Sequence, residues 1–164
     1  MGVSSSKTEE KALKKIINKS QKECYQIRLD GRSYIRKNKN KVTQYLKQND
    51  VNSAKRLMKI IIREENDFQI YGLLDSNLQK IKENCSSIES SKRCPVKLKS
   101  PLNTILFAAN KLNNRELIKF SDKIIELYGS EYVTQAINNT DKSVNEDLIK
   151  KLETEISEEL IKTR

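Results

Sequence analysis

Apolar residues recur at every third or fourth position between residues 13 and 46, a pattern typical of one face of a long helix. The stripe consists of Leu13, Ile16, Ile17, Cys24, Ile27, Tyr34, Ile35, Val42, Tyr45 and Leu46. Gly31 falls on it and either admits a close partner helix or marks a kink. Gln48, Asn49 and Asp50 supply a turn and an N-cap before a second stripe, from Leu57 to Ile81. Two long amphipathic helices with so short a connection predict an antiparallel hairpin.

Shorter helices are predicted in the rest of the chain, after a loop at residues 85–99. Their boundaries are indicated by Ser100-Pro101 as a start, by Arg115 and Gly129 as a start and an end, and by a capping box from Ser143 to Glu146. No strand pattern is present. We therefore predict an all-α fold with a flexible tail at residues 1–7. Residues 8–164 are predicted to form one domain of five or six helices that begins with the long hairpin, although helical spacing alone would equally permit an unrelated bundle.

Composition narrows the possible functions. The 164 residues suit one domain, and 33% of them are charged. Histidine is absent, which removes the usual general base near neutral pH and the commonest metal ligand. The cysteines, Cys24, Cys85 and Cys94, are odd in number and lack CxxC spacing, which favours reduced thiols. No apolar run approaches the roughly 18 residues needed to cross a bilayer. We expect no catalytic residue, no metal and no cofactor.

Positive charge is concentrated in the first part of the chain. Residues 1–62 hold sixteen basic and five acidic groups, a net charge of +11, whereas residues 63–164 hold sixteen and seventeen, a net charge of −1. Helical spacing places many of the basic groups in a ridge opposite the apolar stripe. The predicted ridge consists of Lys11, Lys14, Lys15, Lys19, Lys22, Arg32, Arg36 and Lys37. Its partner should be polyanionic: acidic lipid headgroups, nucleic acid or an acidic protein segment. The six tyrosines lie mostly at core-like spacing and favour packing over base stacking.

The first six residues, Met-Gly-Val-Ser-Ser-Ser, fit the pattern of N-myristoylation at Gly2. After removal of the initiator methionine, the free amine of Gly2 would accept the acyl chain. The alternative is an ordinary unmodified N-terminus. A single myristoyl chain binds a membrane only marginally, so the basic ridge would have to supply the second contribution.

Four segments in order resemble one known family. Residues 54–66 contain Ala54, Arg56, Leu57, Ile61, Ile62, Arg63, Glu64 and Glu65, and further matches follow at residues 104–112, 116–132 and 144–152. Together they resemble the increased-sodium-tolerance family, ESCRT-III-related proteins that remodel membranes and regulate the vacuolar protein sorting ATPase. The resemblance implies an ESCRT-III-like helical core, in which three or four shorter helices pack along the hairpin. It also implies that Arg56, Arg63, Glu64 and Glu65 belong to an assembly surface rather than to an active site.

The resemblance further implies a scaffold without enzymatic activity, cytoplasmic and peripheral on endosomal membranes, that acts in multivesicular body sorting. Its implied partners are acidic membranes, ESCRT-III subunits of the charged-multivesicular-body type, with which it would form a homo- or hetero-polymer, and the AAA ATPase of vacuolar protein sorting. The acidic residues 153–159 depart from the family pattern. Direct contact with the ATPase is therefore not expected unless Ile156, Leu160 and Ile161 form a substitute motif. The rival hypothesis from the charge alone is a basic helical protein that binds nucleic acid.

Overall fold

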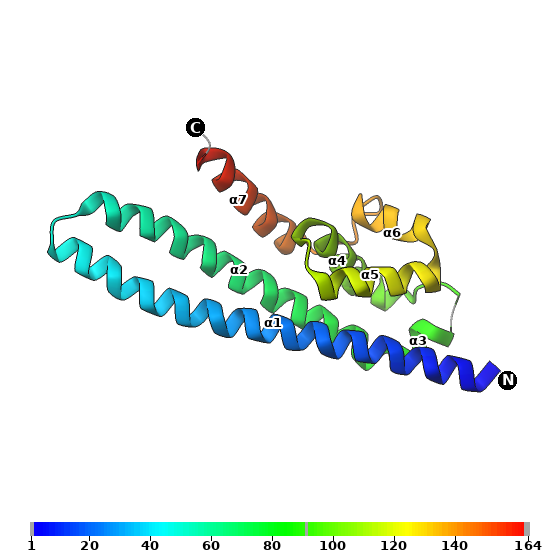
Figure 1. Cartoon of the computed structure of the whole chain (residues 1–164). Coiled ribbons are helices and arrows are strands. Elements are labelled where there is room, and N and C mark those ends of the chain that lie inside the picture. The colour runs from blue at the N-terminus through cyan, green and yellow to red at the C-terminus, as the bar shows by residue number, and fades with distance from the viewer. Residues whose placement is uncertain (1, 91, 163–164) are drawn as a thin grey trace.

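The computed structural model describes the backbone of residues 2–90 and 92–162 and the side chains of residues 12–88 and 92–154. Within these ranges the chain is helical, with no strand, which confirms the predicted all-α class. The helices are α1 (Gly2–Lys47), α2 (Val51–Glu83), α3 (Cys85–Ser90), α4 (Val96–Leu112), α5 (Arg115–Tyr128), α6 (Ser130–Ile137) and α7 (Glu146–Lys162). Figure 1 shows α1 and α2 as a long hairpin, with the shorter helices gathered on one side of it.

The hairpin turns at residues 48–50, as the sequence predicts. Asn49 adopts a left-handed conformation with a φ of 58°, and an oxygen of the Asp50 carboxylate accepts a hydrogen bond of 3.1 Å from the backbone N–H of Ser53. Asp50 is therefore the N-cap of α2. The helix α1 runs unbroken past Gly31, where an added Cβ would lie 3.9 Å from an oxygen of Glu64. Neither a kink nor an unusually close approach explains this glycine.

The bounds of α1 take in residues 2–7, for which the sequence predicts a flexible tail. The physical reason is continuity: no proline or further glycine separates this segment from the amphipathic stretch that follows. The side chains of residues 1–11 lie outside the described part of the chain. The division at residue 8 stays a prediction.

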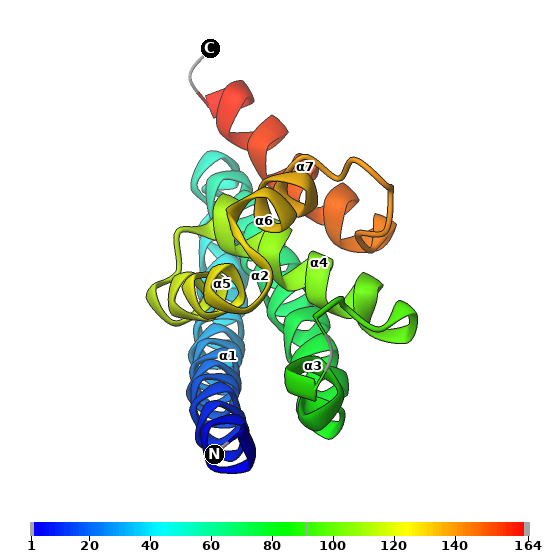
Figure 2. The same cartoon turned by 90° about the vertical axis from the view of Figure 1, so that its right-hand side faces the viewer.

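Two separate clusters of buried side chains hold the hairpin and the shorter helices together. The larger cluster lies where α5 packs on α1 and where α4 and α7 pack on α2. Figure 2 shows these helices stacked over one side of the hairpin. The most deeply buried members of the larger cluster include Leu13, Ile17, Ile70, Leu74, Leu78, Ile81, Leu102, Ile105, Phe120, Ile124 and Leu148. The smaller cluster lies near the hairpin turn and consists of Val42, Ala54 and Ile61, with Ile35, Tyr45 and Leu57 packed against it.

The segment before α4 differs from the prediction. Residues 85–99 were predicted as a loop, but they contain α3 and the first turn of α4, so Pro101 lies inside α4. Burial explains the difference, because Cys85, Ile88 and Leu98 are 1–2% exposed and are drawn into the larger cluster. The described residues form seven helices, one more than the five or six predicted, because α3 and α6 are short additional helices. Four of the shorter helices, α3, α4, α5 and α7, pack along the hairpin, as predicted, and α6 packs on α4 and α5.

The cap of α7 also differs from the predicted capping box. The side-chain oxygen of Asn145, not that of Ser143, accepts a hydrogen bond of 3.0 Å from the backbone N–H of Leu148. The hydroxyl of Ser143 instead donates a hydrogen bond to Asp141 and accepts one from Asn103. The hydrogen bond between Ser143 and Asn103 of α4 therefore replaces the predicted local capping box.

Candidate functional site

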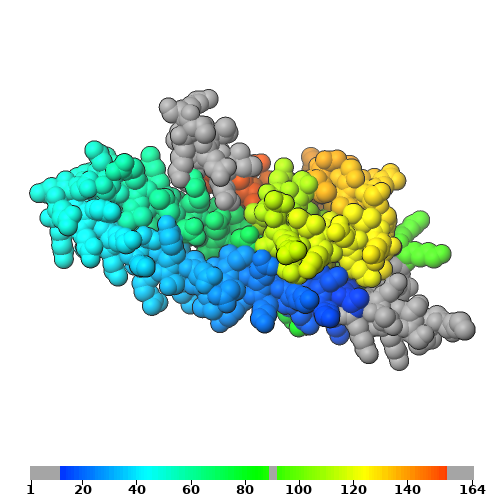
Figure 3. All heavy atoms as spheres, viewed as in Figure 1, coloured from blue at the N-terminus to red at the C-terminus, as the bar shows by residue number. Residues whose placement is uncertain are grey.

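Helical spacing places the predicted basic ridge on one face of α1, and Figure 1 shows α4–α7 gathered on one side of the hairpin. The seven members of the ridge with described side chains, Lys14, Lys15, Lys19, Lys22, Arg32, Arg36 and Lys37, are all exposed. The side chain of Lys11 lies outside the described residues. Figure 3 shows this part of α1 as an open surface along the lower edge of the molecule. Lys14, Lys15, Lys19 and Lys22, with Asn18 among them, line one shallow depression.

Two arginines near the centre of α1 are partly engaged by α2. The guanidinium carbon of Arg32 lies 5.4 Å from the centre of the Phe68 ring, a cation–π contact that leaves Arg32 exposed. Arg28 Nη2 lies 3.1 Å from Asp75 Oδ2. The charge of Arg28 is therefore compensated within the fold, whereas that of Arg32 has only a neutral ring beside it in this contact.

The four residues predicted to form an assembly surface do not lie together. Glu65 Oε1 pairs with Lys39 Nζ of α1 at 3.2 Å, and Glu64 faces Gly31 of α1. Seven-residue spacing instead places Arg56 and Arg63 on another face of α2. Arg56 is exposed and donates a hydrogen bond of 3.2 Å to the hydroxyl of Ser53.

Arg63 is half-buried on the side of α2 that approaches α7. Its neighbour one helical turn further on, Asn66, donates a hydrogen bond of 2.8 Å to the backbone carbonyl oxygen of Lys151. The Nε atom of Arg63 is buried without a hydrogen-bond partner among the described atoms. An ion pair of Arg63 is not found among the residues whose side chains are described, so its predicted pairing stays a prediction.

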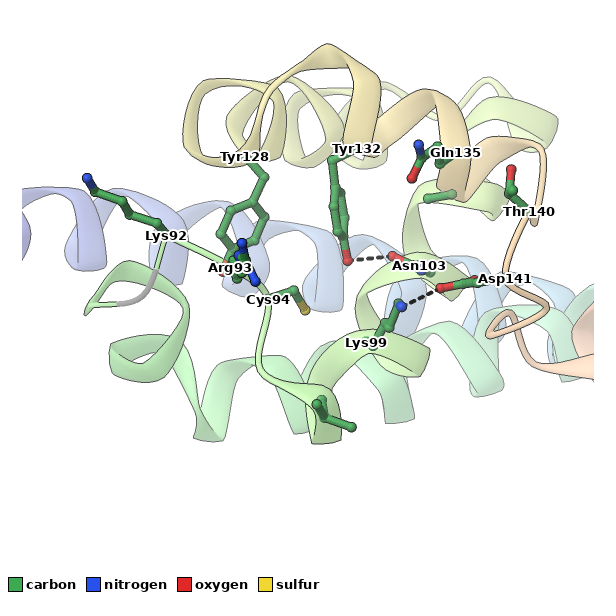
Figure 4. A pocket seen from close by; sticks show the side chains of 12 residues that line it. Lys92, Arg93, Cys94, Lys99, Asn103, Tyr128, Tyr132, Gln135, Thr140 and Asp141 are labelled. Atoms are coloured by element: carbon green, nitrogen blue, oxygen red, sulfur yellow. Dashed lines mark hydrogen bonds and ion pairs between the residues drawn. The ribbon is translucent and has the colours of Figure 1, made fainter.

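A cavity of about 500 Å³, which no sequence motif predicts, lies between the segment that precedes α4, α4 itself and α6 (Figure 4). The hydroxyl of Tyr132 donates a hydrogen bond of 2.8 Å to Asn103 Oδ1, and Asn103 Nδ2 donates one of 2.7 Å to the hydroxyl of Ser143. That hydroxyl donates to Asp141, which also pairs with Lys99 Nζ at 2.7 Å. The polar groups of this cavity therefore satisfy one another and tie α4, α6 and the segment before α7 together.

The electrostatics of the cavity do not favour nucleophilic chemistry. Burial raises the pKa of the Cys94 thiol above its usual value, so the thiol stays protonated at neutral pH. Burial, followed by the hydrogen bond with Cys94, also raises the pKa of Tyr132. The hydrogen bond from Lys99 is the largest cause that lowers the pKa of Asp141 to about 2. Asp141 is thus a permanent anion at neutral pH, neutralised by Lys99.

Two exposed apolar side chains of α1 lie outside the predicted stripe and were not predicted to have a role. Tyr25 is 58% exposed and Leu29 is 42% exposed. The position of Tyr25 around the helix axis indicates that it is exposed. Tyr25 follows the buried Cys24 directly and is therefore turned by about 100° from the core face. By contrast, Tyr34 and Leu46 were placed on the predicted stripe but are 42% and 52% exposed, because they lie where α1 has only α2 beside it.

None of the described helices is long and apolar enough to cross a membrane. The described residues also contain no group of three or more candidate side chains that could hold a metal ion. Cys24, Cys85 and Cys94 form no disulfide.

Comparison with known proteins gives one family. No curated protein sequence matches the chain. The family described as Ist1, regulator of Vps4 activity in the MVB pathway, matches residues 11–164, which is nearly the whole chain and includes the hairpin, the basic face of α1 and α4–α7. The resemblance seen in the four ordered segments is thereby confirmed, and the chain belongs to the Ist1 family of regulators of Vps4 activity in the multivesicular body pathway.

Proposed function

We propose that this protein is a non-enzymatic, ESCRT-III-like scaffold that binds acidic membranes through the basic face of α1 and carries its regulatory activity to ESCRT-III subunits assembled there. The single observation that carries the membrane contact is the exposed cationic face formed by Lys14, Lys15, Lys19, Lys22 and Arg36. This face is uncovered, and acidic side chains are sparse along it: Glu23 and Asp30 are the acidic residues between positions 11 and 41.

The physical basis is the additive attraction of basic groups to an anionic surface. Each lysine or arginine near such a membrane contributes about 1 kcal/mol, and the attraction falls off within a Debye length. Modification of Gly2 would add a myristoyl chain, which by itself binds only marginally. The lipid chain and the basic face would then act together at the cytoplasmic side of endosomal membranes.

The proposed partners are ESCRT-III subunits of the charged-multivesicular-body type, with which the chain would form a mixed polymer. Arg56 and Arg63 of α2 are the residues we propose for subunit contacts, since Glu64 and Glu65 are directed toward α1. Catalysis would belong to the ATPase, and the chain would alter ATPase activity by holding the polymer in place. Direct recruitment through Ile156, Leu160 and Ile161 concerns side chains outside the described residues.

Liposome sedimentation with and without phosphatidylserine tests the membrane contact. Lys15, Lys19 and Lys22 are changed together to glutamate, and the matched control changes the exposed Lys80, Lys97 and Lys150, which removes the same charge from α2, α4 and α7. Removal of three ridge cations should weaken binding by about a hundred-fold, even without counting the repulsion from the new carboxylates. Equal losses in both variants would show that only total charge matters.

Assembly is tested separately by co-sedimentation with an ESCRT-III subunit. The Arg63→Glu variant should remain folded but enter the mixed polymer poorly, and the ATPase activity measured with that polymer should change accordingly. A variant that sediments like wild type would restrict Arg63 to an intramolecular role. A nucleic-acid competitor that displaces the protein from liposomes and binds more tightly than they do would favour the rival hypothesis.

A further inference from the structure

Two apolar side chains interrupt the basic face of α1 near its centre. Lys15, Lys22, Leu29 and Arg36 follow one another at intervals of seven residues and so form one row along the helix. Tyr25 precedes Leu29 by four residues, which places the two side chains next to each other on the surface. They are 58% and 42% exposed, respectively. The row thus has cations at its ends and an apolar pair between them.

The pair is not part of the core of this fold. The core side of α1 at this level is occupied by Cys24, which is 2% exposed. Tyr25 and Leu29 instead border a small crevice of about 120 Å³, which Arg28, Arg32 and Phe68 complete. The crevice combines apolar surface with the guanidinium of Arg32, which lies against the Phe68 ring. Exposed apolar side chains framed by cations have the composition of an interfacial membrane contact.

We propose that Tyr25 and Leu29 insert into the interfacial layer of an acidic bilayer, while Lys22, Arg32 and Arg36 contact the headgroup phosphates around them. This inference rests on the proposed membrane binding. It adds how deeply α1 enters the bilayer surface, which side of α1 faces the lipid, and an apolar contribution to the binding free energy. A tyrosine suits this position because its ring is apolar and its hydroxyl stays at the level of the headgroups. The ring would enter the bilayer surface from the side of α1 that faces away from α4–α7.

The size and charge of the surface favour a lipid surface over a folded protein partner. A stable protein interface buries about 800 Å² on each partner and has a core depleted of charge. Two apolar side chains within a row of cations do not provide such a core. A lipid surface requires no shape complementarity, and its negative charge complements the row along its whole length.

The chain has no tryptophan, so a single Tyr25→Trp substitution reports on this position alone. Tyr34→Trp is the matched control: it is also on α1 and 42% exposed, but nine residues further on, and thus on the opposite side of the helix. With phosphatidylserine vesicles, the emission of Tyr25→Trp should shift to shorter wavelength and should be quenched by brominated acyl chains. Tyr34→Trp should show neither change. The inference is overturned if Tyr25→Trp does not respond on vesicles that bind the protein, or if both positions respond equally.

A second measurement compares affinities at two salt concentrations. The double variant Tyr25→Ser and Leu29→Ser keeps the charge and should bind acidic vesicles about ten-fold more weakly, since partial burial of two apolar side chains is lost. The loss should persist at high salt, which screens the cationic contacts and leaves the apolar ones. Circular dichroism should show unchanged helix content, because both side chains lie at the surface.

The two measurements separate failure of this inference from failure of the proposed function. If the lysine reversals abolish binding and the serine variant binds like wild type, the insertion is overturned and membrane binding stands. If both variants bind like wild type, both proposals are overturned. If Tyr25→Trp responds to RNA or DNA but not to vesicles, the pair stacks on bases and insertion into lipid is overturned.

Discussion

Asn66 of α2 holds α7 through a hydrogen bond of 2.8 Å from its side-chain Nδ2 to the backbone carbonyl oxygen of Lys151. The two residues are 85 positions apart in the chain. Asn66 lies at the middle of α2 (Val51–Glu83), so the contact fixes the last helix against the middle of that helix. The docked position of α7 therefore depends in part on one amide group.

Removal of this amide should loosen α7 without unfolding the molecule. Asn66→Ala is expected to weaken the docking of α7 by about 1 kcal/mol, the typical net contribution of one hydrogen bond. Hydrogen exchange of the backbone amides at residues 148–154 should accelerate about five-fold, while exchange in α5 stays unchanged. Asn52→Ala, at an exposed position of the same helix, is the control. Equal protection of α7 in both variants would show that the hydrogen bond does not hold it.

Gly31 and Gly129 should respond in opposite directions to substitution by alanine. At Gly31 an added Cβ meets its nearest neighbour at an ordinary 3.9 Å within a helix, so Gly31→Ala should raise the free energy of unfolding by about 0.5–1 kcal/mol. Gly129 has a φ of 94°, so Gly129→Ala should lower it by about 1–2 kcal/mol. Urea unfolding monitored by circular dichroism measures both. A destabilising Gly31→Ala would indicate a close approach that the structure does not contain.

The neighbouring isoleucines 61 and 62 test the burial of the hairpin stripe. Ile61 is 1% exposed and Ile62 is 47% exposed. Ile61→Asp places an uncompensated charge inside the smaller cluster and should cost several kcal/mol of a total stability of about 5–15 kcal/mol. Ile62→Asp should change stability by less than about 0.5 kcal/mol. Thermal unfolding distinguishes the two, and similar melting temperatures would contradict the assigned face.

The ion pair of Lys99 and Asp141 predicts a defined dependence of stability on pH. The folded-state pKa of Asp141 is lowered from 3.8 to about 2, so its stabilising contribution is complete above pH 4 and is lost as the pH falls through 2. Asp141→Asn should therefore be slightly less stable than wild type at pH 6, and the difference should shrink between pH 4 and pH 2. Melting temperatures across this range measure it. A constant difference would assign the effect to the lost hydrogen bonds rather than to the charge.

The hairpin and the ends of its helices could be predicted because local chemistry determines them. Asp50 caps α2 through a neighbour three residues away, and Gly129 follows the last residue of α5 in the conformation that only glycine adopts readily. The repeating apolar stripe fixed the class of fold in the same way. Each of these features is encoded within a few residues of where it acts.

Features that depend on distant residues could not be predicted. The start of α4 was missed because Leu98 is helical through burial against other helices, and Ser100 and Pro101 gave a stronger but incorrect local signal. The cavity behind Tyr132 depends on Asn103, 29 residues earlier, and on no spacing that a single sequence exposes. The role of Tyr25 was missed for a different reason: it lies beside the apolar stripe, and the pattern of residue types does not show which residues next to the stripe stay exposed.

The division of the buried side chains into a large and a small cluster gives the hairpin unequal stiffness along its length. The end that carries α4–α7 is a rigid base, whereas the end near residues 48–50 is an arm held by three buried residues and their few neighbours. A lateral load on the arm would bend it, or separate α1 from α2 there, before it disturbed the base. We therefore expect the arm to change its orientation more readily than the base, where the packing of α4 and α5 would stay intact.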